Sequence, residues 1–299
     1  MNFLDPPILP EETLSHRLSG FSGSSVYLIR SRSNALFVRK VATNPETSLR
    51  LEQQFNKLLA FQGYNLAGAT SPNILKTGYY HDCFYMDLEY VSGLDLIEYL
   101  ATADVTQLRN LGERLGTFLI EMGKHPPIEK VPENVTQVFY DKAFILIEKC
   151  PWLPDRVKVD LFLNVKHVAQ LMESKSSLCH GDLTFENILI DQNERIWLID
   201  HLDSFYSHYW QDLSKLHQDI SGEWFRFRRP NVSVPKYTLS YLSDCLLKQI
   251  CKLEPSYLAV HHGLLALVFA RILPYTTGNE IREFVMSRVS HYLDLSLNK

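Results

Sequence analysis

The chain has 299 residues, of which 45% are hydrophobic and 21% charged, and its formal net charge at pH 7 is −4. These proportions are ordinary for a globular protein and exclude a largely disordered chain, and the slight negative charge argues against a protein that coats nucleic acid. The five cysteines form no C-x-x-C pair, the N-terminus lacks a secretion signal, and no run of about 18 apolar residues is present. We therefore expect a cytoplasmic protein with free thiols and no membrane span.

The N-terminal part predicts an antiparallel hairpin. Residues 19–31 and 34–42 are rich in β-formers and are separated by a short polar turn. A loop of small residues at the start of this hairpin contains Gly20, Ser22, Gly23, Ser24 and Ser25. Glycines let backbone N–H groups approach a phosphate closely, and serine hydroxyls add donors, although a plain flexible turn would have the same composition.

Two adjacent cations follow on the second strand of this hairpin. Strand alternation sends Arg39 and Lys40 to opposite faces of the sheet, and Lys40 shares its face with Leu36 and Val38. The residues alone do not say which cation would meet a ligand.

A helix is expected from the cap Asn44-Pro45 to about Phe61. Glu52 lies at the border of its apolar face and points partly inward, where it needs a cationic partner. The alternative is a boundary carboxylate in water. Two further strands are expected at 73–79 and 83–90.

Helices dominate after residue 92. Apolar residues from Leu108 to Met122 recur at helical spacing, and this helix should end near Pro126-Pro127. Further helices are expected at 135–149, 154–173, 211–221, 236–252, 256–273 and 280–297. The change in pattern predicts an N-terminal lobe of residues 1–91 and a helical lobe of residues 92–299 that holds the catalytic and metal sites.

Polar side chains gather between residues 179 and 203. Two short apolar segments joined by the polar turn Asp191–Arg195 predict a second hairpin, flanked by Asp182, Asn187 and Asp200. Mg²⁺ prefers oxygen ligands and takes one or two from protein, so Asn187 and Asp200 suit it. Asp182, held off the metal, could orient or deprotonate an attacking hydroxyl, and its spacing from Asn187 agrees with a kinase catalytic loop.

His180-Gly181-Asp182 with Asn187, followed by Ile199-Asp200 without a glycine, resembles the aminoglycoside phosphotransferase and choline kinase family. Protein kinases instead carry His-Arg-Asp and Asp-Phe-Gly. The resemblance implies an α+β, bilobal protein-kinase-like fold with a small antiparallel β-sheet lobe and a larger, mainly helical lobe. It also implies ATP as co-substrate and Mg²⁺ as cofactor.

The resemblance further implies roles for individual residues. Lys40 would bind the α- and β-phosphates, with Glu52 as its ion-pair partner and Arg39 in solvent. His180 would brace the catalytic loop, and Asp212 would be structural. The adenine would lie between Val26 and Leu189 and contact the carbonyl of Glu89 and the N–H of Val91. Because these last contacts are main-chain, GTP remains possible as the donor.

The predicted function is transfer of the γ-phosphoryl group of ATP to a hydroxyl of a small molecule, a sugar or related alcohol. Only a dozen residues separate Asp200 from Asp212, which leaves no room for the activation loop of a protein kinase. The alternatives are an aminoglycoside- or choline-type kinase and a catalytically silent nucleotide-binding protein. The run Trp224–Arg229 interleaves aromatics with cations and is either part of an acceptor pocket or a solvated basic turn. An aminoglycoside is a polycation and should require a pocket lined by carboxylates. In this sequence Lys215 and the arginines lie among the acidic residues, which favours a neutral or anionic acceptor.

Overall fold

A computed structural model describes residues 8–18, 23–64 and 66–298 of the chain. The chain divides into two compact units, each built from several segments. The sheet unit comprises Met1–Asn65, Thr70–Gly93 and Leu189–Asp203, and the helical unit comprises Leu66–Ala69, Leu94–Ile188 and Ser204–Lys299. The division near residue 93 has one feature that the sequence did not indicate: the segment with Asp200 groups with the sheet unit and not with the helices.

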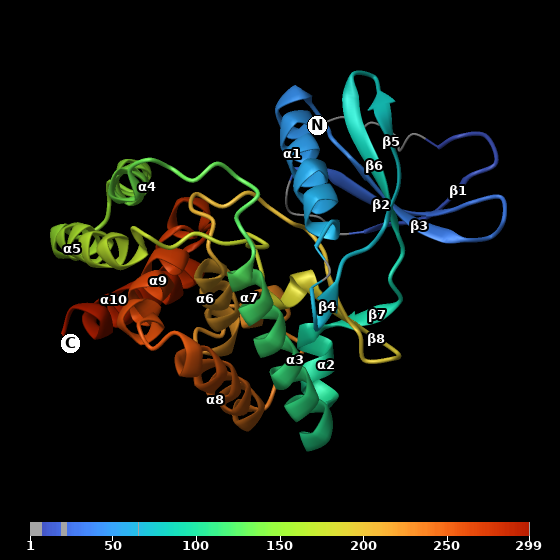
Figure 1. The fold of residues 1–299 in the computed structure, drawn as a ribbon. Helices are drawn as coiled ribbons and strands as arrows, with labels where there is room; N and C mark the ends of the chain where they lie inside the picture. The colour runs from blue at the N-terminus through green and yellow to red at the C-terminus, as the bar shows by residue number, and fades with distance from the viewer. Residues whose placement is uncertain (1–7, 19–22, 65, 299) are drawn as a thin grey trace. The chain divides into compact units, whose positions relative to one another are not determined.

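The main sheet of the sheet unit has five antiparallel strands in the order β1-β2-β3-β6-β5 (Figure 1). These strands are β1 (Thr13–Leu18), β2 (Ser25–Arg30), β3 (Leu36–Val41), β5 (Ile74–Tyr80) and β6 (Cys83–Glu89). The predicted first hairpin is β2 and β3, whose register places Val26 opposite Lys40. The sequence did not predict β1.

Helix α1 (Pro45–Gln62) packs against β6. Its N-terminus forms a capping box, in which the Asn44 side chain accepts the Thr47 N–H and the Thr47 side chain accepts the Asn44 N–H. Pro45 occupies the first turn, where a backbone N–H is not needed. Leu51 and Leu58 form the buried face of α1. They pack in one apolar cluster with Ala42, Cys83, Phe84, Met86 and Leu88.

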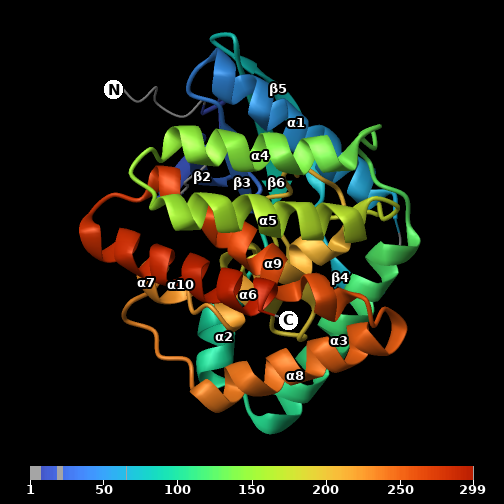
Figure 2. The same ribbon diagram turned by 90° about the vertical axis from the view of Figure 1, so that its left-hand side faces the viewer.

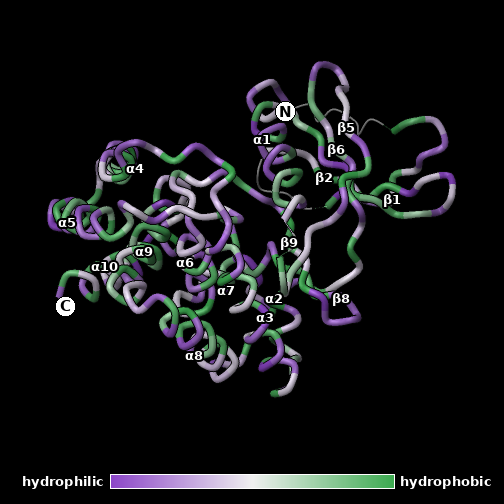
Figure 3. The backbone as a smooth tube through the Cα atoms, viewed as in Figure 1, coloured by the Kyte–Doolittle hydropathy of each residue, from purple (hydrophilic) through white to green (hydrophobic). Residues whose placement is uncertain are grey.

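The predicted second hairpin is present in a smaller sheet with the strand order β4-β9-β8-β7. Its strands are β4 (Ala69–Thr70), β7 (Gly93–Asp95), β8 (Ile188–Asp191) and β9 (Ile196–Leu198). The hydrophilic turn between β8 and β9 is purple in Figure 3, and the Asp191 carboxylate accepts the N–H groups of Asn193 and Arg195 there. A Cβ at Gly93 would lie 2.6 Å from the Ile190 carbonyl oxygen, so only glycine allows this close approach.

The helical unit contains α2 to α10 and two short 3₁₀ segments. The first helices are α2 (Leu96–Thr102), α3 (Val105–Lys124), α4 (Val135–Lys149) and α5 (Asp155–Met172). They are followed by η1 (Phe185–Asn187), α6 (Tyr209–Ile220), α7 (Phe225–Arg228) and α8 (Lys236–Leu253). The last are α9 (Tyr257–Ala270), η2 (Leu273–Tyr275) and α10 (Asn279–Leu297). Helices α4 and α5 lie side by side (Figure 2), and α6 packs against the buried helix α9.

The longer helices agree with the sequence pattern. Helix α4 has the predicted bounds, and α3 ends at Lys124, just before the two prolines. The short helices α2 and α7 were not predicted. Among the described residues, the segment Tyr257–Tyr275 is long and apolar enough to cross a membrane, but 67% of that stretch is buried inside the protein. A core helix has the same composition, so this segment is weak evidence for a membrane span.

Candidate active site

The loop that precedes β8 is held in place by a buried carboxylate on α6. Asp212 accepts the backbone N–H of His180 at 2.6 Å through Oδ2 and that of Gly181 at 2.8 Å through Oδ1. Gly181 has a φ of 93°, in the left-handed region that favours glycine. Because two consecutive N–H groups donate to the same carboxylate, the backbone beside Asp182 is fixed. These contacts agree with the structural role that the sequence suggested for Asp212.

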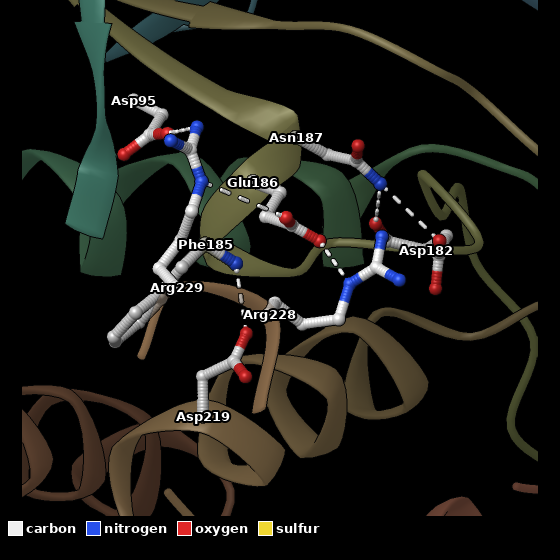
Figure 4. A network of polar contacts seen from close by, with 8 residues as sticks. All are labelled: Asp95, Asp182, Phe185, Glu186, Asn187, Asp219, Arg228 and Arg229. Carbon is white, nitrogen blue, oxygen red and sulfur yellow. Dashed lines mark hydrogen bonds and ion pairs between the residues drawn. The ribbon is translucent and has the colours of Figure 1, made fainter. Parts of the chain in front are cut away.

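Asp182 and Asn187 lie together in the helical unit. The Asn187 Nδ2 donates to the Asp182 carbonyl at 2.8 Å and to its carboxylate Oδ2 at 3.2 Å (Figure 4). The Asp182 N–H donates to His180 Nδ1 at 3.3 Å, so the fully buried His180 braces the loop. Both the backbone and the carboxylate of Asp182 are thus held by hydrogen bonds, as expected for a group that positions a reacting hydroxyl.

Lys215 is a contact of Asp182 that the sequence analysis missed. Its Nζ lies 3.0 Å from Asp182 Oδ1, and the two side chains are 14% and 27% exposed. Burial raises the pKa of the Asp182 carboxyl, but the Lys215 ammonium, together with smaller contributions from His180 and Arg271, holds that pKa below its usual value. The signal was available: Asp212, Lys215 and Asp219 recur at helical spacing on α6, which places them on one face.

Asp219 is a second buried carboxylate beneath the same loop. It accepts the Phe185 N–H at 2.9 Å through Oδ2, while its Oδ1 has no hydrogen-bond partner among the described residues (Figure 4). Burial raises the pKa of Asp219 to about 7, and the single hydrogen bond from Phe185 only partly opposes this.

Asp219 therefore predicts a pH-dependent stability. The folded state keeps the proton of Asp219 up to about pH 7, whereas the unfolded chain loses it near 3.8. In this window the native state binds more protons, so this residue lowers stability as pH rises, by up to about 4 kcal/mol. Asp219→Asn should remove this loss, because an amide oxygen still accepts the Phe185 N–H but does not ionise. The stability of the variant relative to the unmodified protein, from urea unfolding, should increase from pH 4.5 to pH 7.

The exposed Asp244 on α8 provides the control for this prediction. Asp244→Asn should track the unmodified protein across the same pH range. Parallel stability curves for Asp219→Asn and the unmodified protein would contradict the assignment.

The arginines of the basic run Trp224–Arg229 form ion pairs, while Arg226 and Arg229 stay partly exposed to solvent. Arg228 Nε lies 2.9 Å from Glu186 Oε2, and Arg229 forms an ion pair with Asp95 (Figure 4). Arg226 Nε lies 2.6 Å from Glu223 Oε2. Each arginine is thus balanced by a carboxylate of the helical unit. The centroid of the buried Phe225 ring lies 5.8 Å from that of Phe185, so α7 packs against the loop of Asp182. A role of the arginines in an acceptor pocket stays a prediction.

Lys40 and Asp200 form an ion pair within the sheet unit. They line a small cavity together with Gln54, Leu58, Met86 and His201, among other residues. Lys40 is 6% exposed, and burial lowers its pKa to about 8. Asp200 has a φ of 61°, a strained backbone conformation for a residue other than glycine, and such strain is typical of functional positions. The structure thus brings together two residues that are 160 positions apart in the sequence.

The expectation that Arg39 is solvated was wrong. Arg39 is 0% exposed, and its guanidinium binds Asp87 through Nε and Nη2 at 2.7 Å each. Nη1 donates to Glu12 Oε2 at 2.7 Å. The guanidinium carbon of Arg39 lies 5.2 Å from the ring centroid of Phe37 and 5.1 Å from that of Tyr85. The face of the sheet opposite Lys40 is therefore covered by aromatic rings and carboxylates, which remove Arg39 from water.

The expected pairing of Glu52 with Lys40 is also not seen. Glu52 Oε1 accepts the Tyr79 hydroxyl at 3.0 Å, whereas the carboxylate bound by Lys40 is that of Asp200. The α1 residues that line the cavity with Lys40 are Gln54 and Leu58, which are both uncharged. Glu52 lies on a neighbouring part of the helix surface and reaches β5 instead.

The remaining residues that were expected to contact the nucleotide belong to the sheet unit. Gly20 and Ser22 lie outside the described residues. Gly23 has a φ of 83° and its carbonyl accepts the Thr43 hydroxyl at 2.9 Å. The Glu89 side chain accepts from Asn73 Nδ2 at 2.7 Å. The half-buried residues Ser24, Val26, Val91 and Leu189 and the buried Ser25 all belong to this unit, and their contacts with a nucleotide stay a prediction.

Two side chains fit a hard cation by their donor chemistry. The Nδ2 of Asn187 is engaged by Asp182, which leaves Oδ1 as the atom for a cation. Lys40 contacts Oδ1 of Asp200, so the second carboxylate oxygen is available. Among the described residues, no group of three or more His, Cys, Asp and Glu is placed to hold a metal. One amide and one carboxylate oxygen suit Mg²⁺, which keeps several water or phosphate ligands.

Comparison with known proteins identifies similar chains. A family model described as a phosphotransferase enzyme family matches residues 13–233. No curated protein matches the chain.

Solved structures similar to the chain include a thermostable mutant of aminoglycoside phosphotransferase APH(4)-Ia with AMP-PNP and hygromycin B. It is 14% identical, with a TM-score of 0.63 and coverage of 96% of both chains. The GDP complex of wild-type aminoglycoside 2'-phosphotransferase-IIIa is 15% identical, with a TM-score of 0.63 and coverage of 96% and 92%. Amicoumacin kinase hAmiN with AMP-PNP and Ca²⁺ is 12% identical, with a TM-score of 0.58 and coverage of 97% and 90%. Likeness at these identities concerns the fold, and it confirms the predicted α+β fold with a sheet lobe and a helical lobe.

Proposed function

Because the chain belongs to the phosphotransferase enzyme family, as its His180-Gly181-Asp182 motif indicated, we propose that it transfers the γ-phosphoryl group of ATP to a hydroxyl of a small molecule, a sugar or related alcohol. The observation that carries the proposal is the restrained carboxylate of Asp182. It is held by Asn187 and Lys215, on a loop that Asp212 fixes. Phosphoryl transfer requires little covalent chemistry from the protein, so positioning of the hydroxyl and of the phosphates accounts for most of the catalysis.

Asp182 orients the acceptor hydroxyl and accepts its proton as the bond to phosphorus forms. The Lys215 ammonium keeps this carboxylate ionised in the resting enzyme, so that a free oxygen can accept the hydrogen bond. Once Asp182 has accepted the proton it is a neutral acid, and the Lys215 ammonium can still donate a hydrogen bond to one of its oxygens.

The sheet unit binds the nucleotide in this proposal. Lys40 contacts the phosphates, the loop from Gly20 to Ser25 covers them, and Glu89 and Val91 meet the base by main-chain groups. Asn187 and Asp200 would hold Mg²⁺, which when bound neutralises the developing charge on the phosphate oxygens. Solved structures of similar proteins contain GDP or AMP-PNP, which supports a purine nucleotide as the donor.

Removal of Lys215 gives a prediction for the pH dependence of the reaction. Without the ammonium, burial is less opposed and the pKa of Asp182 rises. The acid limb of the kcat profile should therefore move to higher pH in Lys215→Met. Lys166→Met, which removes an exposed charge on α5, is the control and should keep the original profile. An unchanged acid limb in Lys215→Met would show that Lys215 does not set the ionisation of the base.

The proposal is tested by a screen for the acceptor. Pools of sugars, amino alcohols and nucleosides are incubated with the protein, Mg²⁺ and either ATP or GTP, and formation of the nucleoside diphosphate is followed. At least one pool should raise the rate above that without acceptor. Tight nucleotide binding with no acceptor-dependent rate in any pool would favour the alternative of a catalytically silent nucleotide-binding protein.

A further inference from the structure

Two cations of the helical unit lie against one aromatic ring. The Nζ of Lys142, on α4, is 5.8 Å from the centroid of the Phe205 ring. The guanidinium carbon of Arg271, directly after α9, is 5.5 Å from the same centroid. Both side chains belong to half-buried residues. Three segments far apart in the sequence thus bring two positive charges to one place.

Neither of these two cations is held by a carboxylate at ion-pair distance. In the part of the chain that the structure describes, Lys142 and Arg271 form no ion pair, and each lies against the Phe205 ring. Burial lowers the pKa of Lys142, and the positive charges of Arg271 and Lys149 lower it further. Burial also lowers the pKa of Arg271. Half-buried like charges that share a ring cost free energy unless an anion arrives.

Arg271, but not Lys142, is an electrostatic partner of Asp182: its guanidinium attracts the Asp182 carboxylate. Lys215 is paired with Asp182, and Arg226, Arg228 and Arg229 are each paired with a carboxylate. Of these six cations of the helical unit, Lys142 and Arg271 are therefore the two that form no ion pair with a carboxylate among the described residues.

We propose that Lys142 and Arg271 bind an anionic group, a phosphate or a carboxylate, of the molecule whose hydroxyl is phosphorylated. This inference rests on the proposed function and specifies its substrate class. The forked guanidinium donors of Arg271 suit both oxyanions, and Lys142 adds a point charge. Phe205 holds the two cations in place and offers an apolar face. A polycationic acceptor would be repelled by the same charges.

Acceptors that differ only in charge test the inference. The pairs are glycerol 3-phosphate with glycerol, and glucuronate with glucose, and glucosamine is the cationic member. The anionic member of at least one pair should have the lower KM, and the two pairs distinguish phosphate from carboxylate. In the double variant Lys142→Gln/Arg271→Gln the KM of that compound should rise by about 10- to 100-fold, with a smaller change in kcat, because charge-assisted hydrogen bonds are lost.

The control has the same change of charge elsewhere in the helical unit. Arg109 and Lys166 are exposed on α3 and α5, and the variant Arg109→Gln/Lys166→Gln should keep the KM of the unmodified enzyme. An equal rise of KM in both double variants would mean that overall charge, and not the Lys142–Arg271 pair, attracts the acceptor, and would overturn the inference.

A binding measurement keeps the inference testable if no acceptor turns over. Inorganic phosphate, compared with chloride at equal ionic strength and with Mg²⁺ and ADP present, should raise the melting temperature of the unmodified protein and of the control variant. The Lys142→Gln/Arg271→Gln variant should lose this rise, and an equal rise in all three would overturn the inference.

The two proposals fail in different ways. If the unmodified enzyme and the Lys142→Gln/Arg271→Gln variant phosphorylate neutral or cationic acceptors equally well, and anionic acceptors no better, the proposed function stands and the anion site does not. If phosphate binds through the pair but no hydroxyl compound is phosphorylated, the anion site stands and the proposed function does not.

Discussion

Asp182→Asn should lower kcat by about 10²- to 10⁴-fold while nucleotide affinity changes little, because the variant removes the proton acceptor and keeps the shape of the loop. Asn187 Nδ2 and Lys215 contact different oxygens of the carboxylate, so the amide oxygen keeps one of these two contacts, and Asn187 still donates to the Asp182 carbonyl. The nucleotide ligands proposed in the sheet unit are untouched. Turnover is measured with the acceptor found by the screen, and nucleotide affinity by calorimetry.

Two outcomes would count against this role for Asp182. One is turnover within a few-fold of the unmodified enzyme. The other is a parallel loss of nucleotide affinity, which would make Asp182 part of the nucleotide site. Asp244→Asn, the same chemical change at an exposed position of α8, controls for nonspecific effects and should retain full turnover.

Arg39→Met should destabilise the protein by about 3–5 kcal/mol, because it leaves buried carboxylate charge without a partner. Asp87 is 4% exposed and accepts two of the guanidinium hydrogen bonds, and Glu12 accepts others. Methionine retains most of the contact with Phe37 and Tyr85, so the loss reports the ion pairs and not a cavity. Urea unfolding measures the change.

Lys40→Met is the matched control on the adjacent residue. Asp200 is 37% exposed and can be solvated when Lys40 is removed, so the loss of stability should be smaller. Its effect should appear in ATP affinity instead. If ATP affinity, measured where both variants are folded, falls more in Arg39→Met than in Lys40→Met, the phosphate ligand has been assigned to the wrong residue.

The contrast between Arg39 and Lys40 shows what strand alternation can predict. Alternation placed the two residues on opposite faces, and the structure agrees. It did not reveal that the Arg39 face is covered, because the covering groups come from elsewhere. Asp87 lies opposite Arg39 in the β3–β6 register, 48 residues away, and Glu12 comes from the N-terminal segment. The environment of a strand residue thus depends on pairings that no local pattern contains.

Glu52 was misassigned for a related reason. Helical periodicity correctly turned it toward the border of α1, but the identity of its partner depends on which strand lies beneath. Helix α1 packs against β6, and Glu52 reaches the Tyr79 hydroxyl of the neighbouring edge strand β5. The partner of Lys40 is Asp200, which directly follows the β8–β9 hairpin. Contacts between residues more than a hundred positions apart are the hardest to infer from one sequence.

The catalytic loop was the most predictable part of the site. The turn at Gly181 and the proximity of Asp182 to Asn187 follow from one short motif, whereas the structural role of Asp212 was implied by the family resemblance. The arginine run was less readable, because a row of cations looks the same whether it faces water or carboxylates. Glu186 and Asp95, which balance it, lie about 40 and 130 residues earlier in the chain.

Phosphorus NMR of the reaction tests the central claim most directly. With ATP, Mg²⁺ and the acceptor identified by the screen, the γ-phosphoryl signal should decrease while an equal amount of a phosphomonoester appears, and Asp182→Asn should suppress both changes. Release of the γ-phosphoryl group only as inorganic phosphate, or formation of the ester at the same rate in Asp182→Asn, would contradict the account.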